Sequence, residues 1–177
     1  MSTQDGGGTP LNVRAAYASV STALFLLGLK AWAAVQTASV AMLGSLADTG
    51  LDLVASLVLL FSVRYAAMPP DEDHRFGHGK AESLAALFQV ALIAVSAALI
   101  AWRAVQRLMS DAVTVEAESG ILVSVIAIVA TFFLIAYQKS IIRRTRSIAI
   151  ETDSLHYQSD LVLNLSVIAA LVLDQYA

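Results

Sequence analysis

Two pairs of potential metal ligands stand inside apolar stretches of the sequence. Asp48 and Asp52 lie in GSLADTGLDLVASL, and His156 and Asp160 lie in DSLHYQSDLVLNL. Both members of each pair share one helix face, because residues four apart are about one turn from each other. Ligands from two helices can converge on one ion. Three carboxylates and one imidazole suit tetrahedral zinc, while iron(II), cadmium and manganese remain open.

The cost of burying these charges also points to a dication. An ionised side chain at the centre of a bilayer costs roughly 2.5–3.5 kcal/mol, so three unpaired aspartates would cost roughly 8–10 kcal/mol. No lysine or arginine of the two stretches stands at the same depth. A bound dication would compensate for the carboxylates. Protonated, hydrogen-bonded aspartates and a proton relay without metal are the alternatives.

A second cluster of potential ligands lies in the polar segment MPPDEDHRFGHGK. Asp71, His74 and His78 combine carboxylate and imidazole at short spacing, and Gly77 and Gly79 let the backbone fold around an ion. We predict a weaker metal site here, because three protein ligands leave the remaining position to water. A solvated acidic loop that binds no metal is the alternative.

Three more polar residues stand within the apolar stretches. Lys30 either pairs with a carboxylate or reaches toward a membrane interface, and it is no ligand because an ammonium group has no lone pair. Gln158 and Asn164 lie close to His156 and Asp160 in the sequence. They either hydrogen-bond to the ligands or join neighbouring helices.

The composition predicts the kind of protein that positions these residues. Of the 177 residues, 58% are hydrophobic and 14% are charged, whereas a soluble domain has about 45–50% and about 25%. The apolar excess must face something other than water, and lipid is the first expectation. The net charge of −3 gives no basic signature for a nucleic-acid partner. The absence of cysteine excludes disulfides and thiolate metal sites.

We predict an all-α fold, a polytopic transmembrane helix bundle with five spans. The spans are expected at 12–35, 40–66, 81–108, 119–138 and 148–173. The polar, glycine-rich residues 1–11 are predicted to be disordered. The expected connections are Gln36–Ser39, the loop that follows Met68-Pro69-Pro70, Ser110–Glu118 and Lys139–Arg146.

The distribution of basic residues predicts the orientation. With a cytoplasmic N-terminus, only Arg103 and Arg107 fall at outer ends of spans. Apart from Lys30, which lies within the first span, the other basic residues then lie inside, as the positive-inside rule requires; they are Arg14, Arg64, Arg75, Lys80, Lys139, Arg143, Arg144 and Arg146.

Three sequence stretches, in order, resemble the cation diffusion facilitator family, and within it the bacterial ferrous-iron and zinc efflux type. They are SLADTGLD in the second span, HRFGHGKAESLAAL entering the third, and HYQSDLVLNL in the fifth. With the spacing of the spans, the resemblance covers most of the chain from Arg14 to Leu173.

The resemblance implies a homodimeric metal/proton antiporter in the cell membrane, for bacteria the inner membrane. It implies Zn²⁺ or Fe²⁺, with Cd²⁺ as a further option, as the exported ion and protons as the counter-ion. Lys80 matches a family lysine that pairs with an acidic residue of the partner subunit. The resemblance implies a transport site made by Asp48, Asp52, His156 and Asp160, and a loop site made by Asp71, His74 and His78.

The sequence departs from the family pattern at its end. Family members usually have a sixth span and a soluble cytoplasmic domain, and this sequence ends at Ala177 after the fifth span. We therefore expect a truncated chain without the cytoplasmic C-terminal domain, and a metal-binding fragment without transport activity is one alternative. A membrane enzyme is another, although the HExxH and GxSxG signatures are absent. A proton channel would leave the histidines of the loop unexplained.

Overall fold

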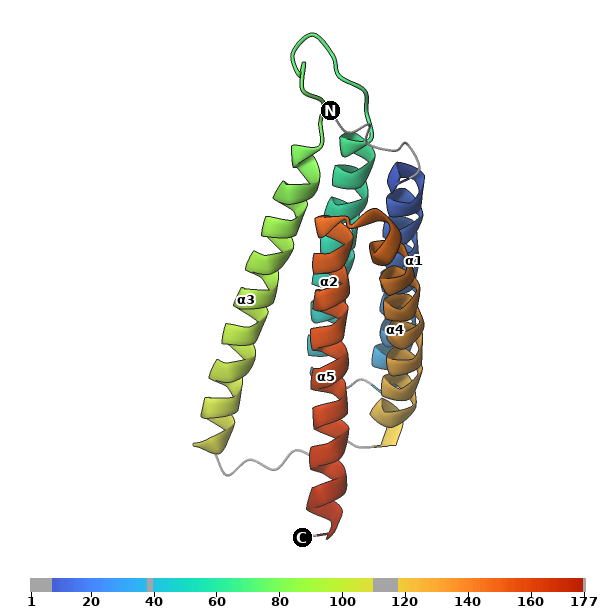
Figure 1. Cartoon of the computed structure of the whole chain (residues 1–177). Helices are drawn as coiled ribbons and strands as arrows, with labels where there is room; N and C mark the ends of the chain where they lie inside the picture. The colour runs from blue at the N-terminus through green and yellow to red at the C-terminus, as the bar shows by residue number, and fades with distance from the viewer. Residues whose placement is uncertain (1–7, 38–39, 110–117, 177) are drawn as a thin grey trace.

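The computed structural model describes residues 8–37, 40–109 and 118–176, which form an all-helical bundle (Figure 1). Its helices are α1 (Gly8–Thr37), α2 (Val40–Ala66), α3 (Lys80–Leu108), α4 (Glu118–Thr145) and α5 (Ile148–Tyr176). The described ranges contain no strand. The predicted all-α class is therefore confirmed.

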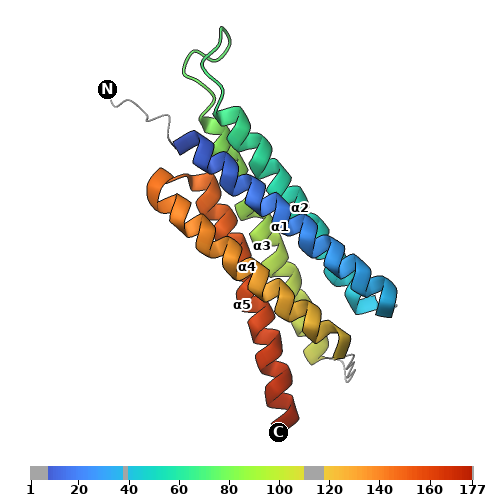
Figure 2. The ribbon, with the colours of Figure 1, turned by 90° about the vertical axis from the view of Figure 1, so that its right-hand side faces the viewer.

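The helices run up and down beside one another. α1 packs chiefly against α2 and α4, while α5 packs against α3 and α4 and also contacts α2. The loop between α2 and α3 emerges at the end of the bundle where α1 begins (Figure 1). At the opposite end α5 extends beyond the other helices, as both views show (Figures 1 and 2).

Four helices contain segments long and apolar enough to cross a membrane. These segments are Pro10–Gln36, Leu43–Ala66, Lys80–Trp102 and Leu122–Thr145. Large apolar side chains point outward from them, with Phe61 67% and Phe133 68% exposed, which suits lipid and would be unfavourable in water. The chain is thus a multi-pass membrane protein. Among the described residues, α5 contains no such segment. Its sequence includes the acidic residues Glu151, Asp153 and Asp160. The count of five spans and the cytoplasmic N-terminus stay predictions.

The predicted connection Lys139–Arg146 is wrong, because α4 continues to Thr145. The segment contains no glycine or proline, and basic side chains are favourable near a helix C-terminus. The actual turn consists of Arg146, which has a φ of 52°, and Ser147, whose Oγ accepts a hydrogen bond from the N–H of Ile150 at 3.4 Å. A very short turn therefore reverses the chain between α4 and α5.

The predicted disordered segment 1–11 is too long, because α1 begins at Gly8 rather than Asn12. Proline is tolerated in the first turn of a helix, where an N–H would lack an intrahelical acceptor. Pro10 therefore does not delay the helix. Residues 1–7, and most of the predicted connection Ser110–Glu118, lie outside the described residues.

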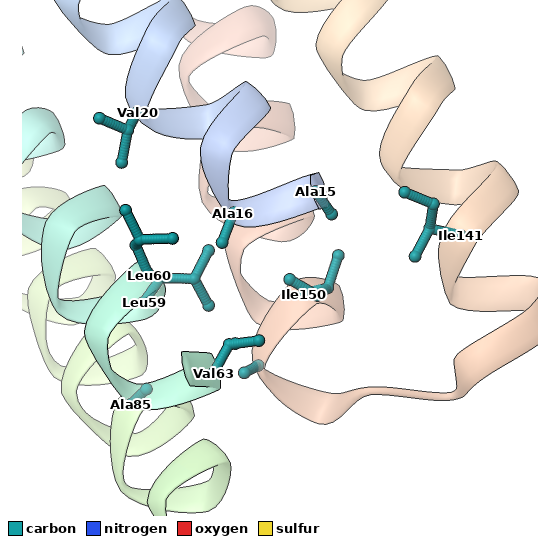
Figure 3. Packing of buried hydrophobic residues seen from close by; sticks show 10 residues of the cluster. Ala15, Ala16, Val20, Leu59, Leu60, Val63, Ala85, Ile141 and Ile150 are labelled. Carbon is teal, nitrogen blue, oxygen red and sulfur yellow. The ribbon is translucent and has the colours of Figure 1, made fainter. Parts of the chain in front are cut away.

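The apolar core depends on small residues. Ala15 and Ala16 of α1, Ala85 of α3 and Ala149 of α5 are at most 1% exposed, which lets the helices approach closely. Figure 3 shows the two α1 alanines between the larger side chains of α2 and those of α4 and α5. These larger residues are Leu59, Leu60, Val63, Ile141 and Ile150.

A fully buried carboxylate joins four helices. Asp153 of α5 accepts hydrogen bonds from Ser19 Oγ of α1, Gln89 Nε2 of α3 and Gln138 Nε2 of α4, each at 2.6 Å. All four side chains are 0% exposed. Because a buried polar group is costly without a partner, this hub fixes the relative positions of the helices.

A second polar contact lies nearer the end of the bundle. Glu82, in the first turn of α3, accepts hydrogen bonds from Asn12 Nδ2 at 3.2 Å and from Ser147 Oγ at 2.7 Å. It thus ties the start of α1 and the turn between α4 and α5 to the start of α3.

Replacing Asp153 with alanine should destabilise the bundle by about 3 kcal/mol, because three buried donors lose their acceptor at once. Thermal unfolding in detergent, followed by circular dichroism, measures the effect. Ser159→Ala is the matched control, since Ser159 is exposed and bonds only to Leu155 O of its own helix. Equal unfolding temperatures for the two variants would show that the hub contributes nothing.

Candidate metal sites

A pocket of about 260 Å³ lies among the helices, and all five contribute to its lining. The lining mixes apolar and polar side chains, and among them are three carboxylates, one imidazole and one ammonium. They are Asp48, Asp52, Asp160, His156 and Lys30. The carboxylates, the imidazole and the ammonium therefore come from α1, α2 and α5.

Three of the predicted ligands converge in this pocket. His156 Nε2 lies 3.0 Å from Asp52 Oδ1 and 3.6 Å from Asp160 Oδ2. One ligand atom from each of the three residues lies within 4.8 Å of the other two. This spacing would allow a single ion to bind between the two helices.

Asp48, the fourth predicted ligand, lines the same pocket but stands apart from this cluster. It lies one turn before Asp52 on α2 and is exposed. The structure thus brings Asp52, His156 and Asp160 together and leaves Asp48 at the edge of the pocket, outside the convergent cluster.

Tyr157 fixes the rotation of α5 that points His156 toward Asp52. Its hydroxyl hydrogen-bonds with Ser56 Oγ of α2 at 3.0 Å and donates to the carbonyl of Ser19 on α1 at 3.4 Å. Ser56 stands one helical turn after Asp52. Because Tyr157 directly follows His156, these contacts to α1 and α2 hold the imidazole in place.

The loop residues also converge. Asp71 Oδ1 lies 3.2 Å from His74 Nδ1, and Asp71 Oδ2 lies 3.3 Å from His78 Nε2. His78 is 5% exposed, and its ring packs edge-on against Tyr65 with centroids 4.4 Å apart. The three residues form the second group in the described chain whose ligand atoms lie within 4.8 Å of one another.

The backbone conformation of this loop favours the binding of a cation. The N–H of His74 donates to Asp71 Oδ1 at 2.6 Å, and this bond, with help from the His74 ring, lowers the pKa of the Asp71 carboxyl. The carboxyl is therefore ionised, as a ligand must be. Gly77 has a φ of 78°, a conformation that side-chain-bearing residues rarely adopt, and its N–H donates to His74 O at 2.9 Å.

The other predicted polar residues have simpler roles. Lys80 is the first residue of α3 and is exposed, with no salt bridge to any described residue. Gln158 donates to Ser154 of its own helix, and Asn164 donates to the backbone carbonyl of Asp160 at 2.9 Å. Neither amide donates to a ligand side chain.

Sequence reasoning missed the Asp153 hub. Its signal was present, because Gln89 and Asp153 are polar residues within apolar stretches and Asp153 precedes His156 by three residues on the same helix face. Gln138 was taken as the end of a span, whereas α4 continues beyond it and buries it completely.

Comparison with known proteins agrees with this architecture. Residues 16–177 match the model of the cation efflux transmembrane domain. The chain is 48% identical over 162 residues to the cation-efflux pump FieF of Shewanella oneidensis and 43% identical over 163 residues to that of Escherichia fergusonii. Each alignment covers 92% of this chain, and 55% and 54% of the respective relatives.

The chain thus spans about half the length of these curated relatives. The family match nevertheless covers nearly all of the helical bundle, including both clusters of potential ligands. The family consists of efflux transporters rather than enzymes. The helices, the two ligand clusters and the matches agree, and the chain belongs to the cation efflux family, the cation diffusion facilitators.

Proposed function

We propose that this chain exports a divalent metal cation in exchange for protons across a bacterial inner membrane. The transported ion is Zn²⁺ or Fe²⁺, with Cd²⁺ as a further option, and the ion binds in the pocket between α2 and α5. The observation that carries this proposal is the convergence of Asp52, His156 and Asp160 inside a bundle of membrane-spanning helices. The relatives' name, cation-efflux pump, supports it.

The contact between Asp52 and His156 explains how one site can hold either cargo. Their ligand atoms face each other at 3.0 Å, a hydrogen-bond distance that requires a proton between them. A metal ion that binds both atoms must displace that proton, because metal ligands bind in their deprotonated forms. Exposing the pocket alternately to the two sides then couples inward proton flow to outward metal movement.

The loop site is proposed to bind the same class of ion more weakly. It combines the exposed side chains of Asp71 and His74 with the buried imidazole of His78. Because Asp71 and His74 are exposed, water can complete the coordination. Such a site can hold an ion close to the end of the bundle without enclosing it.

The transport prediction concerns Asp52. In proteoliposomes that contain this chain and a zinc-sensitive dye, a proton gradient should drive zinc uptake, and Asp52→Ala should abolish it by removing the carboxylate closest to His156 Nε2. Asp73→Ala removes an exposed carboxylate that belongs to neither ligand cluster and should leave uptake intact. Undiminished uptake by Asp52→Ala would refute the site.

The same assay separates the second candidate function, a metal-binding chain without transport activity of its own. The chain matches only about half of each relative, and the assay asks whether this half transports by itself. The second candidate predicts zinc binding that depends on Asp52 and no uptake by the unsubstituted chain.

The exchange prediction concerns protons. Zinc added to the detergent-solubilised protein in weak buffer should release protons, and Asp160→Asn should release fewer, because one ligand oxygen is lost. A pH-sensitive dye measures the release. Ser159→Ala removes a neighbouring exposed side chain that bonds only to the backbone of its own helix and does not line the pocket, and it serves as the control. Equal release by all three proteins would show that Asp160 takes no part in the exchange.

The loop prediction uses two glycines of the same segment. Gly77→Ala forces a side chain into the left-handed region at a cost of about 1–2 kcal/mol, and we expect it to weaken zinc binding at the loop by about fivefold or more. Gly79→Ala, where an added Cβ meets nothing within 4 Å and φ is not in that region, should have no effect. Zinc titration of both variants in an Asp52→Ala background isolates the loop. Identical affinities would contradict the assignment.

A further inference from the structure

One charged group of the pocket is left without a role by this mechanism. Lys30 stands in the second half of α1, seven residues before its end at Thr37 and inside a membrane-spanning segment, and its side chain is partly buried. An ammonium group in such a place is costly. It cannot bind a metal ion, and it has the same sign of charge as the proposed cargo.

The surroundings of Lys30 are specific. Its Nζ donates to Thr49 Oγ1 at 2.6 Å, and Thr49 is 1% exposed. Thr49 lies on α2 beside Asp48 and one turn from Asp52, so α2 supplies both the holder of the ammonium and two of the carboxylates. No salt bridge joins Lys30 to a described carboxylate, although Asp48, Asp52 and Asp160 line the same pocket.

The charges of the pocket lining fit one dication. Three carboxylates and one ammonium give two negative charges when the imidazole is neutral, and the described residues that line the pocket include no other charged group. A divalent ion therefore makes the loaded pocket neutral. Without Lys30 the loaded pocket would keep one uncompensated negative charge, which an apolar bundle disfavours.

We propose that Lys30 is a built-in counter-charge of the transport pocket, which Thr49 holds away from the ligand atoms so that it weakens metal binding enough for release. This inference rests on the proposed function. A transport site must bind its ion well enough to accept it and weakly enough to let it leave. A fixed positive charge in the same pocket lowers the affinity for a dication by direct repulsion, without occupying a ligand.

The variant Lys30→Met tests the charge while keeping a long unbranched side chain. At mildly alkaline pH, where carboxyl groups bind few protons, we expect zinc to bind the pocket about tenfold more tightly or better and to dissociate more slowly. Competition with a zinc-chelating dye gives the affinity, and stopped-flow mixing with excess chelator gives the dissociation rate. Binding in the pocket is defined as the part that Asp52→Ala removes.

Thr49→Val and Lys139→Met complete the experiment. Thr49→Val frees the ammonium to move onto the carboxylates, so zinc should bind more weakly, opposite to Lys30→Met. Lys139→Met removes the same charge from the exposed surface of α4 and should leave the affinity of the pocket unchanged. If Lys30→Met does not fold, Thr49→Val decides the question alone.

The outcomes separate this inference from the proposed function. Unchanged or weaker zinc binding by Lys30→Met overturns the counter-charge, as does unchanged binding by Thr49→Val. Both results leave the transport site standing if Asp52→Ala still removes binding. Zinc binding that Asp52→Ala does not affect overturns both proposals.

Discussion

The structure depends on the way acidic side chains are accommodated in an apolar bundle. Carboxyl groups are costly among hydrocarbon groups in their ionised form, and several carboxyl groups lie between these helices. The central contact is the one between Asp52 of α2 and His156 of α5, at 3.0 Å. It joins two helices that are distant in the sequence. It also brings together a carboxylate oxygen and an imidazole nitrogen, between which a proton or a metal ion can bind.

Asp153 meets the same constraint in the opposite way. Its carboxylate is surrounded by side-chain donors from three other helices, so all its interactions are made within the protein. Asp52 and Asp160 have fewer partners and face a pocket. Asp153 and His156 lie only three residues apart on α5. The hydrogen bonds of Asp153 therefore also fix the part of α5 that positions His156 in the pocket. The fully hydrogen-bonded carboxyl group of Asp153 holds the bundle together, whereas those of Asp52 and Asp160, which have fewer hydrogen-bond partners, are available to a cation.

Much of this architecture could be predicted from sequence. The length of the apolar stretches predicted the helices, and α2 has the predicted bounds Val40–Ala66. The i, i+4 spacing correctly predicted that His156 and Asp160 share one face of a helix. The distance between α2 and α5 was not predictable, because it depends on tertiary packing through Tyr157 and the buried alanines. The position of Asp48 outside the convergent cluster has the same origin. The length of α4 was mispredicted because hydropathy marks the end of an apolar stretch, and a helix can continue past it.

Locating zinc directly is the most decisive measurement. X-ray diffraction from zinc-soaked crystals of this chain, with data collected on both sides of the zinc absorption edge, would show each bound ion as an anomalous difference peak. We predict a peak within coordination distance of Asp52, His156 and Asp160, between α2 and α5. A peak at Asp71, His74 and His78 alone, with none in the pocket at saturating zinc, would contradict the account.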